Sequence, residues 1–436
     1  MALGISLHSL KDYEWRRKTA LVNNSILETQ LNALNLRWNE AVNSIEHWST
    51  LFSRGIVPRH FSSLEEYIKS VPLMTKADIQ SGQMSYKHPR PNTFRITGGS
   101  TAEPIQVPSW KDEYSHTRMD PWLGRHWLGI HPNDKMFLFW GHAHLLGSGW
   151  RGRLNAVVRL LKDRVQGYER VSCYDLTEER LRAVGDKLVS SSANFVVGYS
   201  HALDALARVN SDRADKFHAK KFKAIIAAAE GLPMEDSRSV IETTFGTKLA
   251  MEYGSVETNL IAHSNNEDTY DVFWNNYMLE FKPENSYSDI SEVLVTSLYP
   301  RCTPLFRYSI GDKFRLGSGE CVGPSVISFA DVIGRSNSFV KVPGGPKLHS
   351  EVFSHLVRDI QCINAYQIVS TPSTLFLDLV TEKPGIDSVI EAQIMAKAER
   401  ASPGLSSVMQ IREVSTLHKS IAGKLPMVVH MSDKVL

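Results

Sequence analysis

Apolar positions near the start of the chain recur every three or four residues, the spacing of a helix with one buried face. This pattern predicts helices over most of residues 7–52. The side chains expected on the buried face are Leu31, Leu34, Trp38, Ala41, Ile45 and Trp48.

The middle of the chain alternates short apolar runs with helical patterns. Residues 195–199, 222–228 and 249–253 are interpreted as buried strands, and a helix is expected to begin at Ser200. Strands and helices in repeated alternation predict an α/β fold.

Glycine and proline crowd together in residues 333–346, which is typical of a joint between domains. We therefore expect a large N-terminal α/β domain, residues 1–334, and a small mobile C-terminal α+β domain, residues 335–436. The smaller domain is expected to contain helices at residues 351–360 and 386–400 and strands at 375–380 and 409–414.

Composition and charge argue against few classes of function. The 436 residues carry a formal net charge of +2, so no strong basic field predicts a nucleic-acid partner. The basic segment 216–223 is interpreted as a solvated lead-in to a strand, with a contact to the phosphate of a second nucleotide as the alternative.

The four cysteines are widely spaced and form no CxxC pair, so neither a zinc ribbon nor a redox motif is predicted. Few cysteines fit a reducing compartment, and there is no signal-peptide pattern and no run of about 18 apolar residues. The expectation is a cytoplasmic protein with no membrane span. A homodimer is compatible with the sequence, which does not determine the oligomeric state.

Four short motifs carry residues suited to nucleotide chemistry. The loop at 97–104 has three hydroxyls and two glycines, which could wrap phosphate oxygens, although a simple surface turn is the alternative. It is not a Walker A loop, so a kinase or ordinary ATPase is disfavoured. Glu257 follows a predicted strand, where a carboxylate could hold Mg²⁺ or stay solvated.

Two further residues complete the set. Asp312 follows Gly311 and could accept hydrogen bonds from two vicinal hydroxyls, or belong to a turn. Lys424 follows Gly423 and could bring a mobile cation onto a phosphate, although most lysines near a terminus lie on the surface.

The aromatic, histidine-bearing segment 139–150 is a candidate wall of a substrate pocket. His142 and His144 alternate and would face one side of a strand, but with no third ligand a metal site is not favoured. Trp140 and Trp150 are interpreted as core residues in preference to a binding platform. The predicted pocket residues are Trp140, His142, His144 and Tyr199.

In their order and spacing these motifs resemble the adenylate-forming superfamily of acyl-CoA synthetases and adenylation domains. More narrowly, nearly the whole chain looks like the phenylacetate-CoA ligase and CapK-like branch. The resemblance implies a phosphate loop at Thr97, Gly98, Gly99, Ser100 and Thr101. It implies an adenine and ribose site at Glu230, Gly231, Tyr253, Gly254, Ser255 and Asp312, with Arg335 at the domain joint. It implies Mg²⁺ at Glu257 and Thr101, a hinge at Asn337 and catalysis by Lys424, Glu257 and Thr101.

Some positions depart from the family pattern. Ala102-Glu103 stand where the family usually has Gly-Lys, Val256 where it has threonine, and Ser309-Ile310 where it has Arg-Thr. Residues 259–271 lack the cysteines that bind zinc in some branch members, so no zinc is expected.

The resemblance implies ATP-dependent activation of a carboxylic acid as acyl-AMP, with release of pyrophosphate. The activated acyl group would then pass to CoA, or in the CapK-like alternative to an amine, giving an amide. A non-catalytic nucleotide-binding module is a further alternative, motivated by Val256 and Ala102-Glu103. The implied cofactors are ATP and Mg²⁺, with CoA as co-substrate.

Overall fold

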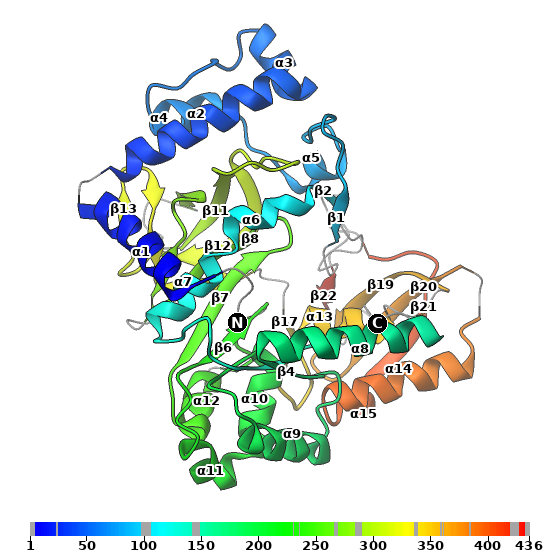
Figure 1. Ribbon diagram of the computed structural model, residues 1–436. Helices are drawn as coiled ribbons and strands as arrows, with labels where there is room; N and C mark the ends of the chain where they lie inside the picture. The colour runs from blue at the N-terminus through cyan, green and yellow to red at the C-terminus, as the bar shows by residue number, and fades with distance from the viewer. Residues whose placement is uncertain are drawn as a thin grey trace.

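The computed structural model describes residues 5–22, 25–96, 106–141, 149–229, 231–234, 236–265, 269–283, 290–334, 339–357, 360, 362–382, 385–418 and 427–431. These residues form a larger α/β unit and, beyond it in the chain, a smaller α+β unit (Figure 1).

The helical prediction for the first part of the chain is confirmed. The structure has α1 (Leu7–Val22), α2 (Ile26–Ser44), α3 (Glu46–Ser53), α4 (Leu64–Ser70) and α5 (Lys76–Gln80). The predicted face is buried except for Leu31, which is partly exposed. Trp38 and Trp48 lie 5.2 Å apart between ring centroids, and both pack edge-on against Phe306. This contact joins the N-terminal helices to the rest of the larger unit.

An eight-stranded sheet is the centre of the larger unit, in the order β15-β9-β8-β7-β6-β5-β3-β4. The neighbours β4, β3, β5, β6 and β7 are parallel, and β8, β9 and β15 continue antiparallel. The strands are β3 (Met136–Phe139), β4 (Tyr168–Val171), β5 (Phe195–Tyr199), β6 (Ile225–Ala228), β7 (Leu249–Ser255), β8 (Asn259–Ser264), β9 (Tyr270–Val272) and β15 (Ser328–Phe329). Every residue of β5 and β6 is buried, as expected for parallel strands covered on both faces.

Helices alternate with these strands, as the repeated pattern predicts. They are α6 (Tyr114–Thr117), α7 (Asp120–Trp127), α8 (Gly149–Gln166), α9 (Glu178–Ser190), α10 (Ser200–Val209), α11 (Ala214–His218) and α12 (Ser237–Phe245). The sequence patterns did not predict α8. Its ribbon runs along the outside of the molecule in the foreground of Figure 1.

A second, antiparallel sheet has the order β10-β11-β12-β16. Its strands are β10 (Tyr277–Pro283), β11 (Ile290–Ser297), β12 (Tyr308–Arg315) and β16 (Asp331–Gly334). The β11–β12 register shifts between Ser309 and Lys313, and Gly311 has φ +82 there. Two hairpins flank this sheet, β1 (Thr93–Ile96) with β2 (Gln106–Ser109) and β13 (Cys321–Val322) with β14 (Ser325–Val326).

The smaller unit has its own hydrophobic core and a four-stranded sheet in the order β21-β20-β19-β22. Its elements are β17 (Phe339–Lys341), β18 (Lys347–His349), α13 (Ser350–Val357), β19 (Ile363–Ser370), β20 (Leu375–Thr381), α14 (Ser388–Ala401), α15 (Leu405–Val408), β21 (Met409–Glu413) and β22 (Val428–His430). Residues 335–338 lie outside the described residues, so the domain boundary at 334/335 stays a prediction.

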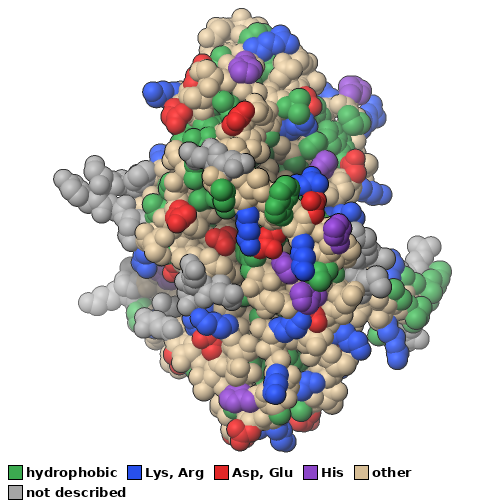
Figure 2. Space-filling model, turned by 60° about the vertical axis from the view of Figure 1, so that its left-hand side comes forward, with side chains coloured by type: hydrophobic (Ala, Val, Ile, Leu, Met, Phe, Trp, Pro, Cys, Tyr) green, Lys and Arg blue, Asp and Glu red, His purple; other side chains and the backbone are tan. Residues whose placement is uncertain are grey.

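The basic segment 216–223 lies before β6, at the amino edge of the parallel strands. Lys220 Nζ donates to the main-chain oxygen of Ser191 at 2.5 Å, and Lys223 pairs with Asp134 at 2.6 Å. These contacts favour the structural interpretation over the phosphate contact. On the face drawn in Figure 2, basic and acidic side chains are interspersed. No helix in the described part of the chain has the length and hydropathy needed to span a bilayer.

Candidate functional site

The carboxyl ends of β3, β5, β6 and β7 meet at one edge of the sheet, because these strands are parallel. Ligands of open α/β sheets bind outside this edge. Ala229, directly after β6, has φ +74, which is unusual for a residue with a side chain and often marks a functional site. Gly231, a predicted adenine contact, follows it and is exposed.

The turn from β7 into β8 holds the next predicted residues in a fixed geometry. A Cβ on Gly254 would lie 2.1 Å from the carbonyl oxygen of Asn259, so only glycine fits there. Ser255 N donates to Thr258 Oγ1 at 3.1 Å, and Thr258 N donates to Ser255 Oγ at 3.3 Å. These reciprocal bonds fix the main chain on both sides of Glu257.

Glu257 is only 4% exposed, and its surroundings include two residues that the sequence analysis did not select. Tyr308 Oη donates to Glu257 Oε1 at 3.3 Å, and Arg301 Nη2 donates to the main-chain oxygen of Glu257. No local sequence signal distinguishes Arg301 from other arginines in loops.

Arg301 is a permanent buried cation. Burial alone would lower its pKa, but the nearby Tyr299, Tyr277, Glu113 and Glu257 outweigh that effect and raise the pKa above its usual value. Among the described residues, its Nε and Nη1 donate to no partner. Buried donors of this kind are normally satisfied by an ordered water or a ligand.

The predicted adenine-stacking and ribose-binding residues are direct neighbours. Tyr253 Oη donates to Asp312 Oδ2 at 2.6 Å. The Tyr253 ring packs edge-on against Phe314, with 4.8 Å between centroids. Asp312 lies in the irregular part of β12, and bulges of this kind re-aim side chains next to active sites. Tyr308 and Asp312 both belong to β12, so this strand contacts both Glu257 and Tyr253.

A cavity of about 470 Å³ lies between the two units. Tyr199 lines it, and Trp140 packs against Tyr199 with ring centroids 4.2 Å apart. The residues that line the cavity are Ser172, Cys173, Tyr174, Asp175, Arg180, Tyr199, His201, Val352, His355, Leu356, Lys397, Arg400 and Ala401. The cations therefore outnumber the single acidic side chain. A main-chain bond from Leu176 N to Arg400 O, at 2.5 Å, also joins the two units here.

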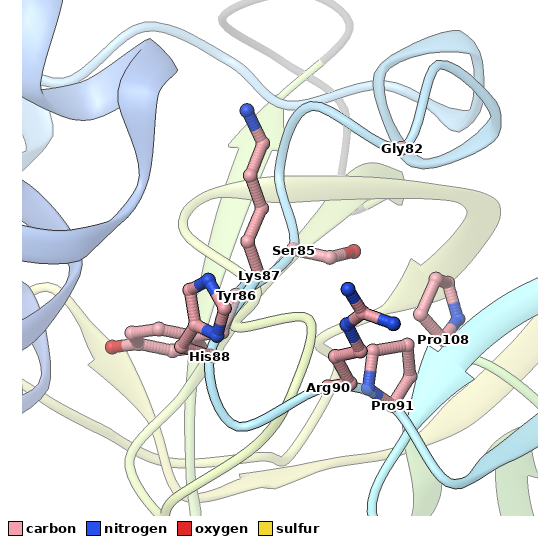
Figure 3. Close-up of a pocket in the computed structure, with 8 residues that line it drawn as sticks. All are labelled: Gly82, Ser85, Tyr86, Lys87, His88, Arg90, Pro91 and Pro108. Atoms are coloured by element: carbon pink, nitrogen blue, oxygen red, sulfur yellow. The ribbon is translucent and has the colours of Figure 1, made fainter.

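A second hollow, of about 410 Å³, lies in the larger unit and contains none of the predicted site residues. In Figure 3 the Arg90 guanidinium points into it between Ser85 and Pro108, whereas Lys87 points away. Lys87 instead forms an exposed ion pair with Glu46 at 2.9 Å.

Several predicted site residues lie outside the described residues. They are Thr97, Gly98, Gly99, Ser100, Thr101, His142, His144, Glu230, Arg335, Asn337 and Lys424. The expectation that Trp150 belongs to the core is wrong, because this side chain is 71% exposed on α8.

Glu257 suits Mg²⁺ as one ligand among several, the others coming from substrate phosphates and water. Mg²⁺ takes oxygen ligands and is commonly held by one or two carboxylates together with substrate phosphates and water. Glu257 offers one carboxylate in a fixed turn, so it could supply such a ligand. In the described ranges, no group of three His, Cys, Asp or Glu side chains is arranged to hold a metal ion.

Comparisons with known proteins agree with this architecture. No family model matches the chain. Protein CapK of Staphylococcus aureus is 24% identical over 336 residues, which are 73% of this chain and 70% of that protein.

The crystal structure of 2-hydroxyisobutyryl-CoA ligase with 2-HIB-AMP and CoA in the thioesterification state has a TM-score of 0.58 at 15% identity. It covers 93% of this chain and 90% of that chain. An open conformation of the same ligase gives 0.53, over 92% and 90%. The chain therefore has the fold of the adenylate-forming acyl-CoA ligases, which confirms the predicted α/β class and the resemblance at the level of fold.

Proposed function

We propose that this chain, which has the fold of the adenylate-forming ligases, activates a carboxylic acid with ATP and transfers the acyl group to an acceptor. The observation that carries the proposal is the junction between the two sheets. Tyr253 and Asp312 are 59 residues apart in sequence yet joined by a 2.6 Å hydrogen bond, and the buried Glu257 lies in the turn that follows the strand of Tyr253. An aromatic ring beside a carboxylate suits a nucleoside, and a second carboxylate suits its phosphate-bound cation.

Each residue has a proposed role. The adenine ring would lie against Tyr253, next to Glu230 and Gly231, and the ribose hydroxyls would donate to Asp312. Thr97, Gly98, Gly99, Ser100 and Thr101 would hold the phosphates, with Arg335 and Lys424 contributed from the joint and the smaller domain. Glu257 and Thr101 would hold Mg²⁺, which supplies charge neutralisation of the triphosphate.

The first reaction joins a carboxylate oxygen of the acid to the α-phosphorus of ATP and breaks the bond from that phosphorus to pyrophosphate. The contribution of the chain is to align the two reactants and to stabilise negative charge, with Lys424 donating to the oxygens at the reacting centre. Rotation of the smaller domain about Asn337 would then withdraw Lys424 and admit the acceptor. In the second reaction the acceptor attacks the acyl carbon, loses its proton, and AMP leaves.

The cavity between the units favours CoA as the acceptor over a simple amine. CoA carries several phosphate groups, and Arg180, Lys397 and Arg400 give this cavity an excess of positive charge. Tyr199 and Trp140 would form an aromatic wall on the side of the acyl group. An amine acceptor remains the second candidate, because the resemblance to the CapK-like branch implies it and protein CapK is a relative found by sequence.

The proposal is tested by pyrophosphate release from MgATP with a panel of aryl, fatty, amino and sugar acids. Hydroxylamine would trap acyl-AMP as a hydroxamate, with CoA present or absent. Release for one acid class, with hydroxamate formed without CoA, would support adenylation. Faster turnover with CoA would favour the thioester ligase, whereas faster turnover with an amine would favour the amide ligase.

A matched pair of lysine variants makes the test specific. Lys424→Ala is expected to lower pyrophosphate release by about 100-fold or more, the effect of removing a donor to transition-state charge. Lys419→Ala, five residues earlier, is the control and should retain activity. ATP binding without pyrophosphate release across the panel would instead support the non-catalytic module, and normal release by Lys424→Ala would refute the role of that lysine.

A further inference from the structure

Helix α8 exposes an unusual number of large apolar side chains. Leu154 is 55% exposed, Val157 54%, Leu161 59% and Val165 72%, and Trp150 at the start of the helix is 71% exposed. Apolar side chains scattered singly on a surface need no explanation, but this group belongs to one helix of 18 residues.

These side chains form one stripe. With about 3.6 residues per turn, positions 150, 154, 157, 158, 161 and 165 fall within an arc of about 100°. Leu160, which is 64% exposed, is the exception and lies about 60° beyond the edge of this arc. Asp163 lies on the opposite side of the helix, where it is buried and paired with Arg170 at 2.8 Å. In residues 157–166 it is the single buried residue. The helix is therefore attached to the protein by its polar side and points its apolar stripe outward, the reverse of an ordinary surface helix.

The charges of α8 are strongly one-sided. Its sequence contains five Lys or Arg residues and one acidic residue, Asp163, whose charge is already paired within the protein. Lys162 and Arg164 are exposed, and by helical geometry they lie on opposite flanks of the stripe. An exposed apolar stripe with a cation on each flank is typical of helices that lie in the interface of an anionic membrane.

We propose that α8 docks the protein reversibly on an anionic lipid surface, with its axis in the plane of that surface. Charge complementarity favours this occupant over a second copy of the chain, because two α8 helices would bring their cations together. A lipid surface accepts an apolar stripe without a matching groove and supplies anionic groups to both flanks. The attachment is peripheral, since none of the helices described is long and apolar enough to span a bilayer.

The test is flotation of the full-length protein with vesicles of phosphatidylcholine alone or with one quarter phosphatidylglycerol. The wild-type protein should float with the anionic vesicles at low salt and stay unbound with neutral vesicles. Salt at about 0.5 M should release it, because the screening length then falls to a few Å. Leu161→Gln/Val165→Gln should lower the bound fraction at least about tenfold, because both exposed apolar contacts are lost.

Two further variants separate the two contributions. Lys162→Gln/Arg164→Gln should weaken binding to anionic vesicles and, like the wild type, stay unbound with neutral vesicles. Leu36→Gln/Val389→Gln is the matched control, because these side chains are 55% and 69% exposed on α2 and α14. This control should float like the wild type, and thermal melting should show that all variants are folded.

Absence of wild-type flotation with anionic vesicles at low salt would overturn the proposal, as would equal flotation of the stripe variant. A wild-type dimer that becomes a monomer in Leu161→Gln/Val165→Gln, without any vesicle binding, would identify the stripe as a subunit interface instead.

Discussion

The hydrogen bond between Tyr253 and Asp312 provides the sharpest test of the nucleotide site. Tyr253→Phe keeps the ring and its edge-on contact with Phe314 but removes the hydroxyl that donates to Asp312 at 2.6 Å. If Asp312 binds ribose, this hydroxyl fixes the direction in which the carboxylate points. Its loss should weaken the binding of ATP through the ribose and not through the adenine.

The expected loss of ATP affinity follows from the free energy of this hydrogen bond. A hydrogen bond to a charged acceptor contributes about 1.5–3 kcal/mol, and both residues are only partly buried, so we take about 1–2 kcal/mol. That corresponds to a roughly 5- to 30-fold loss of affinity.

The assay is calorimetric titration with ATP and with 2′-deoxy-ATP and 3′-deoxy-ATP. The wild-type protein should discriminate against both deoxy analogues, and Tyr253→Phe should lose most of that discrimination. Tyr270→Phe is the control, because Tyr270 stacks on Phe329 in the same aromatic cluster but is not bonded to Asp312. Unchanged discrimination in Tyr253→Phe, together with a lower melting temperature, would mean that the bond serves only the fold and would refute the ribose assignment.

Three other outcomes are expected. Gly254→Ala should destabilise the protein by about 1–3 kcal/mol or more in urea unfolding, because the added Cβ would clash with Asn259, and an unchanged midpoint would contradict this. Burial raises the pKa of Asp120 to about 7, above the unfolded value of about 3.9. The stability contributed by the protonated carboxyl is therefore present below about pH 4 and lost as the pH rises through 7. Unfolding of Asp120→Asn at several pH values should show a flatter profile, the difference from wild type reaching on the order of 4 kcal/mol. Arg412→Met should destabilise the smaller unit by about 3–5 kcal/mol, because it removes the guanidinium from the buried Asp378 and leaves His418, at 3.9 Å, as its ionic partner. Proteolysis that releases no fragment of this unit would count against this prediction.

Local pattern was sufficient for the N-terminal helices and for five of the strands. The predicted strands at β5, β6, β7 and β20 are present, because each contains an apolar run bounded by polar or turn-forming residues. The predicted strand β21 is present too, although it has only two apolar residues, Met409 and Ile411. The outward stripe of α8 was not predictable, because sequence alone does not show which side of a helix meets the protein. Trp150 was assigned to the core because tryptophan is usually buried, and its exposure helps to distinguish α8 from an ordinary amphipathic helix.

The candidate site likewise has features that the sequence predicts and features that it does not. The residue types at 253, 257 and 312 could be selected from local motifs, but the contacts between them could not. Arg301 was missed because a single arginine in a loop carries no local signal of burial. It becomes recognisable only when the loop after β11 lies against Glu257, 44 residues away in the chain.

These long-range contacts also constrain how the site can work. Three interactions join the β7–β8 turn to the chain around β12: Tyr253 with Asp312, Glu257 with Tyr308, and Glu257 with Arg301. The proposed base, ribose and metal contacts therefore cannot move independently, because each is held by a residue from the other sheet. Tyr253 and Glu257 lie close together in one chain segment, and Tyr308 and Asp312 lie on one strand, so the two bonds are coupled through the backbone. Contacts coupled in this way give non-additive effects when they are changed together. If the site binds a nucleotide, Tyr253→Phe and Tyr308→Phe combined should cost a different free energy of ATP binding than the sum of the two single changes. Strict additivity would mean that the two contacts act as separate structural bonds.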